Sequence, residues 1–258
     1  MKFSMKPQLL KYLVLGTGGL GLVLRILLYA TGMDEKGLLV TGHWANSGVF
    51  MLTAALAAIL FLCTRPIDGP KVYRSCYPVS CAAGLGAFAA MAGVLFTTIC
   101  EMAISPSSME LAVRLMGFVV MAAFAVIGFC RLMGAKPHFL LHAAVCLYFA
   151  LRMVWQYQQW SSDPQLQDYC FYLGAYVALM LTAYQHAAFD ADMGRHRSLW
   201  LVSLGAVYLC CLSLRGNRDT FLLLGCGIWA FTNLTNLTVR ARRQRPALIL
   251  DEEAPKEA

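Results

Sequence analysis

Two neighbouring apolar segments carry residue types that could bind an anionic group. Arg152, Gln156 and Gln159 recur at i, i+4 and i+7, so they share one face of a helix. Three tyrosines recur at i, i+3 and i+7 on the next segment: Tyr169, Tyr172 and Tyr176. A guanidinium and two amides can donate hydrogen bonds to a carboxylate, a phosphate or a lipid headgroup. The spacing therefore predicts an aromatic-walled binding cavity set with these donors.

Arg25 has a similar setting in the first apolar segment. Arg25 and Arg152 each lie 13 residues or so into a candidate membrane span, which places both about 20 Å from the side on which the span begins. We therefore expect Arg25 to contribute to the same cavity. Two alternatives stay open. The aromatic residues could form an interfacial belt, and each arginine could pair with a carboxylate such as Glu101 or Asp168.

Other polar residues inside the apolar segments are expected to pair with one another. An ionisable side chain exposed to lipid costs several kcal/mol, so such residues usually face the interior of a bundle. Side-chain amides hydrogen-bond between helices for the same reason. The residues assigned to such structural polar pairs are Glu101, Arg114, Asp168, His186, Asp190, Asn233 and Asn236.

A glycine motif near the N-terminus first suggests nucleotide chemistry. Gly16, Gly18 and Gly21 have the spacing G-x-G-x-x-G of dinucleotide-binding folds. Such a fold also needs a second strand before an acidic residue, but the residues that follow Gly21 continue one apolar helical run. The glycines, including Gly19, are therefore predicted to let another helix approach closely, as small residues do in membranes.

The composition requires a membrane protein. Of the 258 residues, 59% are apolar and 14% are charged, whereas about 25% are charged in a soluble domain. Mean hydropathy is +0.60. Eight apolar runs approach the length of about 20 residues that crosses a bilayer. The class predicted is an all-α integral membrane protein, a bundle of eight transmembrane helices near residues 9–32, 44–64, 80–103, 111–134, 138–160, 167–189, 198–215 and 219–239.

The lysines and arginines predict the orientation of this bundle. With a cytoplasmic N-terminus, fifteen of the 21 basic residues lie on the cytoplasmic side and three lie outside. Both termini would then be cytoplasmic, as would the connections 65–79, 131–137 and 190–197. The net charge of +7 follows from this topology, so no nucleic-acid partner is expected. The expected location is the cell membrane.

The chain is predicted to consist of a membrane domain followed by a short tail. Residues 1–239 form a single transmembrane domain, and residues 240–258 form a basic and then acidic cytoplasmic tail that we expect to be disordered. Four arginines at the membrane edge could bind anionic lipid: Arg240, Arg242, Arg243 and Arg245. The scattered cysteines and histidines give no zinc spacing, so we expect no metal and no cofactor. The sequence names no protein partner.

The function expected from these features is transport. A small transporter or solute-binding permease would use an outward-facing polar and aromatic cavity for an anionic group or a lipid headgroup. The alternative is a membrane sensor or accessory subunit without transport, and a lipid-modifying membrane enzyme is a third possibility. The chain contains no nucleophile–base pattern, so we assign no catalytic residue and consider an enzyme the weaker interpretation.

Overall fold

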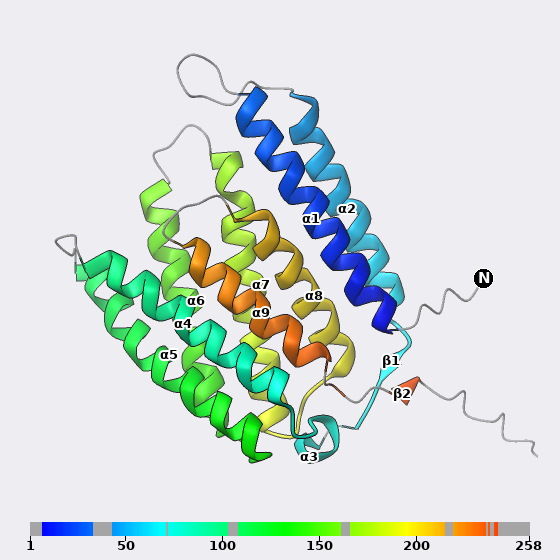
Figure 1. The fold of residues 1–258 in the computed structure, drawn as a ribbon, viewed down its shortest axis with the longest axis vertical. Helices are drawn as coiled ribbons and strands as arrows, with labels where there is room; N and C mark the ends of the chain where they lie inside the picture. The colour runs from blue at the N-terminus through cyan, green and yellow to red at the C-terminus, as the bar shows by residue number, and fades with distance from the viewer. Residues whose placement is uncertain are drawn as a thin grey trace, which may run out of the picture.

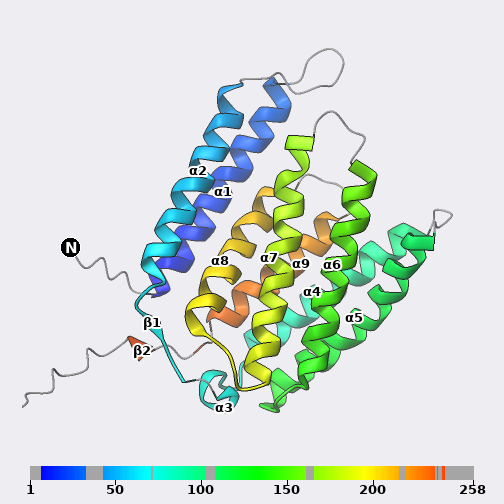
Figure 2. The same cartoon turned by 180° about the vertical axis from the view of Figure 1, so that it is seen from behind.

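The fold was analysed in a computed structural model, which describes residues 7–32, 43–70, 72–102, 108–160, 166–214, 219–235, 237 and 240–241. Within these ranges the chain is helical apart from one two-stranded ribbon (Figures 1 and 2). The elements are α1 (Pro7–Thr31), α2 (Trp44–Cys63), β1 (Ile67–Asp68), α3 (Tyr73–Cys76), α4 (Cys81–Met102), α5 (Ser108–Met133), α6 (Phe139–Trp160), α7 (Leu166–Asp190), α8 (His196–Leu212), α9 (Thr220–Thr235) and β2 (Arg240–Ala241).

Each of the eight predicted apolar segments contains a helix. Within the described residues, five helices are long and apolar enough to cross a membrane: α1, α2, α4, α5 and α6. Helices α8 and α9 are apolar but have 17 and 16 residues, fewer than the roughly 20 that span the hydrocarbon core. Helix α7 has 25 residues, and its tyrosines, Gln185 and His186 make it more polar. The chain is therefore an all-helical protein with five candidate membrane-spanning helices.

Three short elements were not expected from the sequence. Helix α3 is a single turn inside the connection between α2 and α4. Strands β1 and β2 pair antiparallel, with Ile67 opposite Ala241 and Asp68 opposite Arg240. The first two residues of the tail, which we expected to be disordered, therefore form a backbone pair with the α2–α4 connection.

Six helices form a closed ring. Each of α4 to α8 contacts the next helix in the chain, and α9 returns to contact α4. The hairpin of α1 and α2 lies outside the ring and packs mainly against α8 (Figures 1 and 2). Apolar side chains on the outer faces of this hairpin are exposed, for example Met51 at 73% and Ile26 at 57%. Lipid can cover such a surface, whereas the polar residues of the ring face inward.

Helices α4 and α9 approach closely because glycines lie at their crossing. A Cβ atom on Gly93 would lie 2.5 Å from the carbonyl oxygen of Phe221 and 3.2 Å from Cα of Leu222. A Cβ atom on Gly225 would likewise collide with the backbone of Ala89. Small residues permit this backbone contact between membrane helices. The close crossing brings the end of α4 next to the start of α9, where the candidate site lies.

Three predicted cytoplasmic connections meet at one end of the bundle. The backbone N–H of Tyr73 donates to Asp192 Oδ1 at 2.8 Å, and Lys136 Nζ lies 2.6 Å from Asp192 Oδ2. These bonds join the connections that follow α2, α5 and α7. Lys136 and the Tyr73 N–H lower the pKa of Asp192, so the carboxylate stays ionised to a lower pH than usual. After the predicted topology, we call this end of the bundle the inner end and the opposite end the outer end.

Helix α1 packs on α8 through two of the four N-terminal glycines. A Cβ atom on Gly18 would lie 3.1 Å from Cβ of Cys211, and one on Gly21 would lie 2.6 Å from Leu212 Cδ1. Nothing lies within 4 Å of a Cβ on Gly16 or Gly19. The packing prediction is therefore confirmed for Gly18 and Gly21 and wrong for the other two, which face away from α8.

This contact gives a prediction with an internal control. We expect Gly18→Leu to lower stability by about 1–3 kcal/mol, because the added side chain has no space against Cys211. Gly16→Leu adds the same side chain on the open face of the same helix and should leave stability unchanged. Thermal unfolding of the detergent-purified variants measures both. Equal melting temperatures for the two variants would contradict the packing of α1 on α8.

Candidate functional site

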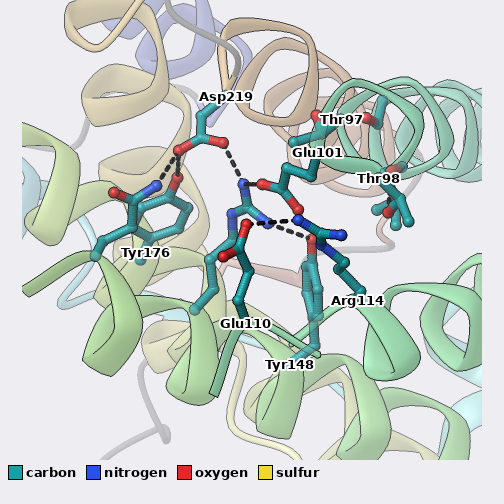
Figure 3. Close-up of polar contacts among 12 residues, drawn as sticks. Thr97, Thr98, Glu101, Glu110, Arg114, Tyr148, Tyr176 and Asp219 are labelled. Atoms are coloured by element: carbon teal, nitrogen blue, oxygen red, sulfur yellow. Dashed lines mark hydrogen bonds and ion pairs between the residues drawn. The ribbon is translucent and has the colours of Figure 1, made fainter. Parts of the chain in front are cut away.

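A buried guanidinium lies at the centre of the ring. Arg152 of α6 is 0% exposed, and its Nη2 donates to Glu101 Oε1 at 2.5 Å. The same nitrogen donates to Asp219 Oδ1, and Nη1 donates to Tyr148 Oη at 3.1 Å. The guanidinium also lies 5.6 Å from the ring centre of Trp155. Figure 3 shows how side chains from α4, α6 and the start of α9 converge on this group.

Asp219 is surrounded by hydrogen-bond donors. Besides Arg152, Gln156 Nε2 donates to Asp219 Oδ2 at 2.5 Å and Tyr176 Oη donates to it at 2.6 Å (Figure 3). Asp219 also directly precedes α9. Its backbone carbonyl oxygen accepts the first helical hydrogen bond, from the backbone N–H of Leu223, at 2.9 Å. The positive end of the helix dipole therefore adds to three side-chain donors. Asp219 thus accepts hydrogen bonds from three side chains.

Glu101 has a poorer environment than Asp219. The hydrogen bonds of the described residues give it one donor, the shared guanidinium of Arg152. Its side chain is 4% exposed, so water replaces few of the missing donors. Two carboxylates therefore share one guanidinium, and they are not equivalent. Of the two, Glu101 accepts fewer hydrogen bonds from the described residues.

A second ion pair lies at the same level of the ring. Arg114 Nη2 donates to Glu110 Oε1 at 2.7 Å within α5 (Figure 3). A Cβ atom on Gly117 would lie 2.8 Å from Thr98 Oγ1, which sets the register between the antiparallel helices α4 and α5. Glu101 lies one turn beyond Thr98 on α4, and Arg114 lies one turn before Gly117 on α5. This register therefore brings Glu101 and Arg114 to the same level along the helix axes. The outer half of the ring is thus rich in charge.

The predicted ligand-binding residues separate into two groups. Arg152, Gln156 and Tyr176 meet at Asp219, as described above. Arg25 is 3% exposed and donates to Tyr29 Oη at 2.5 Å, while its guanidinium lies 5.0 Å from the ring centre of Phe171 and 6.0 Å from that of Tyr172. Gln159 is exposed and Tyr169 is half-buried. The role of these residues in binding a ligand stays a prediction.

Of the residues predicted to form structural polar pairs, one has a partner that the sequence indicated and others have partners that it did not. Glu101 pairs with Arg152, as one alternative expected. Asp190 pairs with His142 rather than with His186, which instead meets Tyr77. Asn233 bonds within its own helix, donating to the Trp229 carbonyl oxygen at 2.8 Å. The side chain of Asp168 and residue Asn236 lie outside the described part of the chain.

Asp219 is the carboxylate of this cluster that the sequence analysis missed. It directly precedes an apolar helical run, which is the usual position of an N-cap aspartate, and this signal was available. The N-cap position did not indicate that the carboxylate of Asp219 points into the six-helix ring and pairs with Arg152. Among the described residues, no group of three or more metal-ligating side chains is placed to hold a metal ion.

Comparison of the chain with protein-family models, curated proteins and solved structures finds no match. The class of protein is therefore defined by the fold and the site alone: an all-helical chain with five candidate membrane-spanning helices and a buried arginine–carboxylate cluster in a six-helix ring.

The Arg152 cluster predicts a large stability effect. We expect Arg152→Ala to cost about 3–5 kcal/mol, because it leaves Glu101 and Asp219 unpaired in a low-dielectric interior. Combining Arg152→Met with Glu101→Gln and Asp219→Asn replaces all three ionisable groups and should recover part of the loss. Thermal unfolding in detergent is the measurement.

Arg197→Ala is the matched control, because Arg197 is exposed and packs over Phe61 with its guanidinium 5.1 Å from the ring centre. It should change stability little. A melting temperature for Arg152→Ala equal to that of Arg197→Ala would show that the cluster does not hold the ring together.

Proposed function

We propose that the chain is a small multi-pass membrane transporter that couples the movement of a solute to a proton bound at Glu101. The observation that carries the proposal is the sharing of one buried guanidinium by two unequal carboxylates. With Glu101 protonated, Arg152 and Asp219 form a balanced pair. With Glu101 ionised, the site around Arg152 gains an unbalanced negative charge, which favours rebinding of a proton. Buried ionisable groups of this kind mark proton relays in pumps and transporters.

The proposed solute enters from the outer end and is small, with an anionic group or a lipid headgroup. Arg25, stacked among Tyr29, Phe171 and Tyr172, supplies a cation close to the aromatic face of α7. Tyr172 lies one turn from Tyr176, which donates to Asp219. Helix α7 therefore connects the aromatic region near Arg25 to the proton site around Arg152.

A membrane sensor or accessory subunit is the second candidate. The observation that favours it is the complete burial of Arg152. A guanidinium held by two carboxylates can fix the packing of helices without binding any solute. In that case the protonation state of Glu101 would have no link to any solute. The two candidates differ in whether solute and proton move together.

The proposed topology has eight spans, with both termini and the inner end in the cytoplasm and the protein in the cell membrane. The meeting of the connections after α2, α5 and α7 at one end supports this arrangement, and the excess of basic residues on that side supports the orientation. Binding of anionic lipid by Arg240, Arg242, Arg243 and Arg245 is part of this proposal. Arg242, Arg243, Arg245 and the side chain of Arg240 lie outside the described part of the chain.

Cysteine labelling tests the topology. The labelling is done in a Cys81→Ser background, which removes an exposed native thiol. The thiol introduced by Met193→Cys should react only with a membrane-permeant thiol reagent. The thiol introduced by Ser107→Cys should react with an impermeant reagent added outside. Met193 is 78% exposed in the connection after α7 and suits this test. Native Cys76 does not, because burial hides it from both sides and raises the pKa of its thiol to about 11. The reverse labelling pattern would overturn the orientation.

Infrared spectroscopy and flux measurements test the function. The purified protein in lipid at neutral pH should give the carbonyl band of a protonated carboxylic acid, and Glu101→Gln should lose it. The matched control is Glu110→Gln, which alters the neighbouring pair with Arg114 and should retain the band.

In proteoliposomes that contain a pH dye, solutes with carboxylate, phosphate or headgroup chemistry should be added one at a time. At least one of these solutes should change the internal pH of proteoliposomes that contain the wild-type protein. The Glu101→Gln variant should carry the same solute without moving protons, so the internal pH should not change. If no solute moves protons and Glu101→Gln is as stable as wild type, the transporter proposal is wrong and the accessory role stands.

A further inference from the structure

A second group of buried polar side chains lies at the inner end of the same ring. His142 of α6 and His186 of α7 stack with their ring centres 5.4 Å apart and an interplanar angle of 23°. Trp229 of α9 packs against both, at 6.1 Å and 5.1 Å between ring centres. The two histidines are 0% and 1% exposed. Three helices of the ring therefore enclose an imidazole pair.

The inner histidines lie well below the Arg152 cluster. Each is ten residues along its helix from a residue of that cluster, His142 from Arg152 and His186 from Tyr176, which is about 15 Å at the rise of an α-helix. Between the two levels, α6 and α7 bury Val145, Phe149, Leu179 and Ala183, together with Thr182, whose hydroxyl donates to the carbonyl oxygen of Ala178 in its own helix. An apolar layer thus separates two buried polar levels.

The hydrogen bonds determine which nitrogen of His142 is available. Nδ1 of His142 lies 2.5 Å from Asp190 Oδ2, and both side chains are 1% exposed. A carboxylate accepts hydrogen bonds, so Nδ1 carries the hydrogen and Nε2 of the neutral ring carries a lone pair. That Nε2 atom is buried and has no hydrogen-bond partner among the described residues, and the same is true of Nε2 of His186.

The charged and titratable groups around His142 favour one added proton and disfavour a second. Asp190 is a counter-ion in direct contact with His142. His186 stacks on His142, and its Nδ1 lies 3.1 Å from Tyr77 Oη. Arg131 of α5 acts on His186. Cys130 of α5 and Tyr73 and Tyr77 of the α3 segment lie within the electrostatic influence of Asp190 and Arg131.

Arg131 lies close to this group and carries a fixed positive charge. Its guanidinium is 3.7 Å from the ring centre of Tyr77. Burial raises the pKa of Tyr77 well above its usual range, so the phenol keeps its proton beside His186. A cation at His186 would face both Arg131 and a charged His142, whereas a cation at His142 faces the carboxylate of Asp190.

We propose that Nε2 of His142 is a proton-binding site at the inner end of the ring. The lone pair on Nε2 takes a proton from hydronium: an N–H bond forms, an O–H bond of hydronium breaks to leave water, and the positive charge passes to the ring. Asp190 is the counter-ion of the imidazolium, and His186 stays neutral. The role of this site in transport rests on the proposed function, in which it is the inner counterpart of Glu101, but proton binding does not.

Histidine NMR of the complete protein in lipid nanodiscs tests the site. With ¹⁵N-labelled imidazoles, the signal assigned to His142 by its loss in His142→Gln should change to the imidazolium pattern between about pH 8 and pH 5. His186 should remain neutral over this range. Asp190→Asn should keep His142 neutral, because it removes the counter-ion and leaves the hydrogen-bond geometry nearly unchanged. Exposed His138, four residues before His142, is the internal control and should titrate in every variant.

Two results would overturn the proposal. One is a His142 signal that stays neutral over the whole range in wild type, and the other is an unchanged His142 titration in Asp190→Asn. The His138 signal verifies that each folded variant senses the pH. The NMR titration uses no solute and no gradient. A failed flux measurement therefore does not contradict proton binding at His142. Likewise, a His142 that stays neutral does not contradict the results for Glu101.

Discussion

The guanidinium of Arg152 imposes the constraint on which the rest of the structure depends. An arginine side chain cannot lose its proton in a protein, so a fully buried one must be matched by negative charge and hydrogen-bond acceptors. Glu101 of α4 and Asp219 at the start of α9 supply them, while Tyr176 of α7 and Gln156 of α6 complete the carboxylate of Asp219. One charge on α6 thus fixes how three other helices are placed around it.

This arrangement is possible because α4 and α9 cross with their backbones in contact. Gly93 and Gly225 leave no side chain between the two helices, so Glu101 and Asp219 reach the same guanidinium from neighbouring helices. A larger residue at either glycine would separate the carboxylates and leave one of them without a counter-charge. Packing and electrostatics therefore support one another in this part of the ring.

Within the described residues, the polar side chains of the ring are divided between two levels. The outer level contains carboxylates around Arg152 and Arg114, and the inner level contains the imidazole pair with Asp190 and Tyr77. The helices α6 and α7 contribute to both levels, with an apolar layer between them. The hairpin of α1 and α2 stays outside this axis and contributes Arg25 beside the aromatic side chains of α7.

The sequence by itself determined the helical membrane class, the approximate positions of the helices and the shared face of Arg152 and Gln156. These follow from local properties, namely the length of apolar runs and the 3.6-residue period of a helix. It also placed Glu101 among the possible partners of an arginine. Only the tertiary structure decided that Asp219 completes the cluster and that His142, rather than His186, holds Asp190. Those pairings depend on how each helix is rotated about its axis and which helices become neighbours, and both are set by packing between segments far apart in the chain.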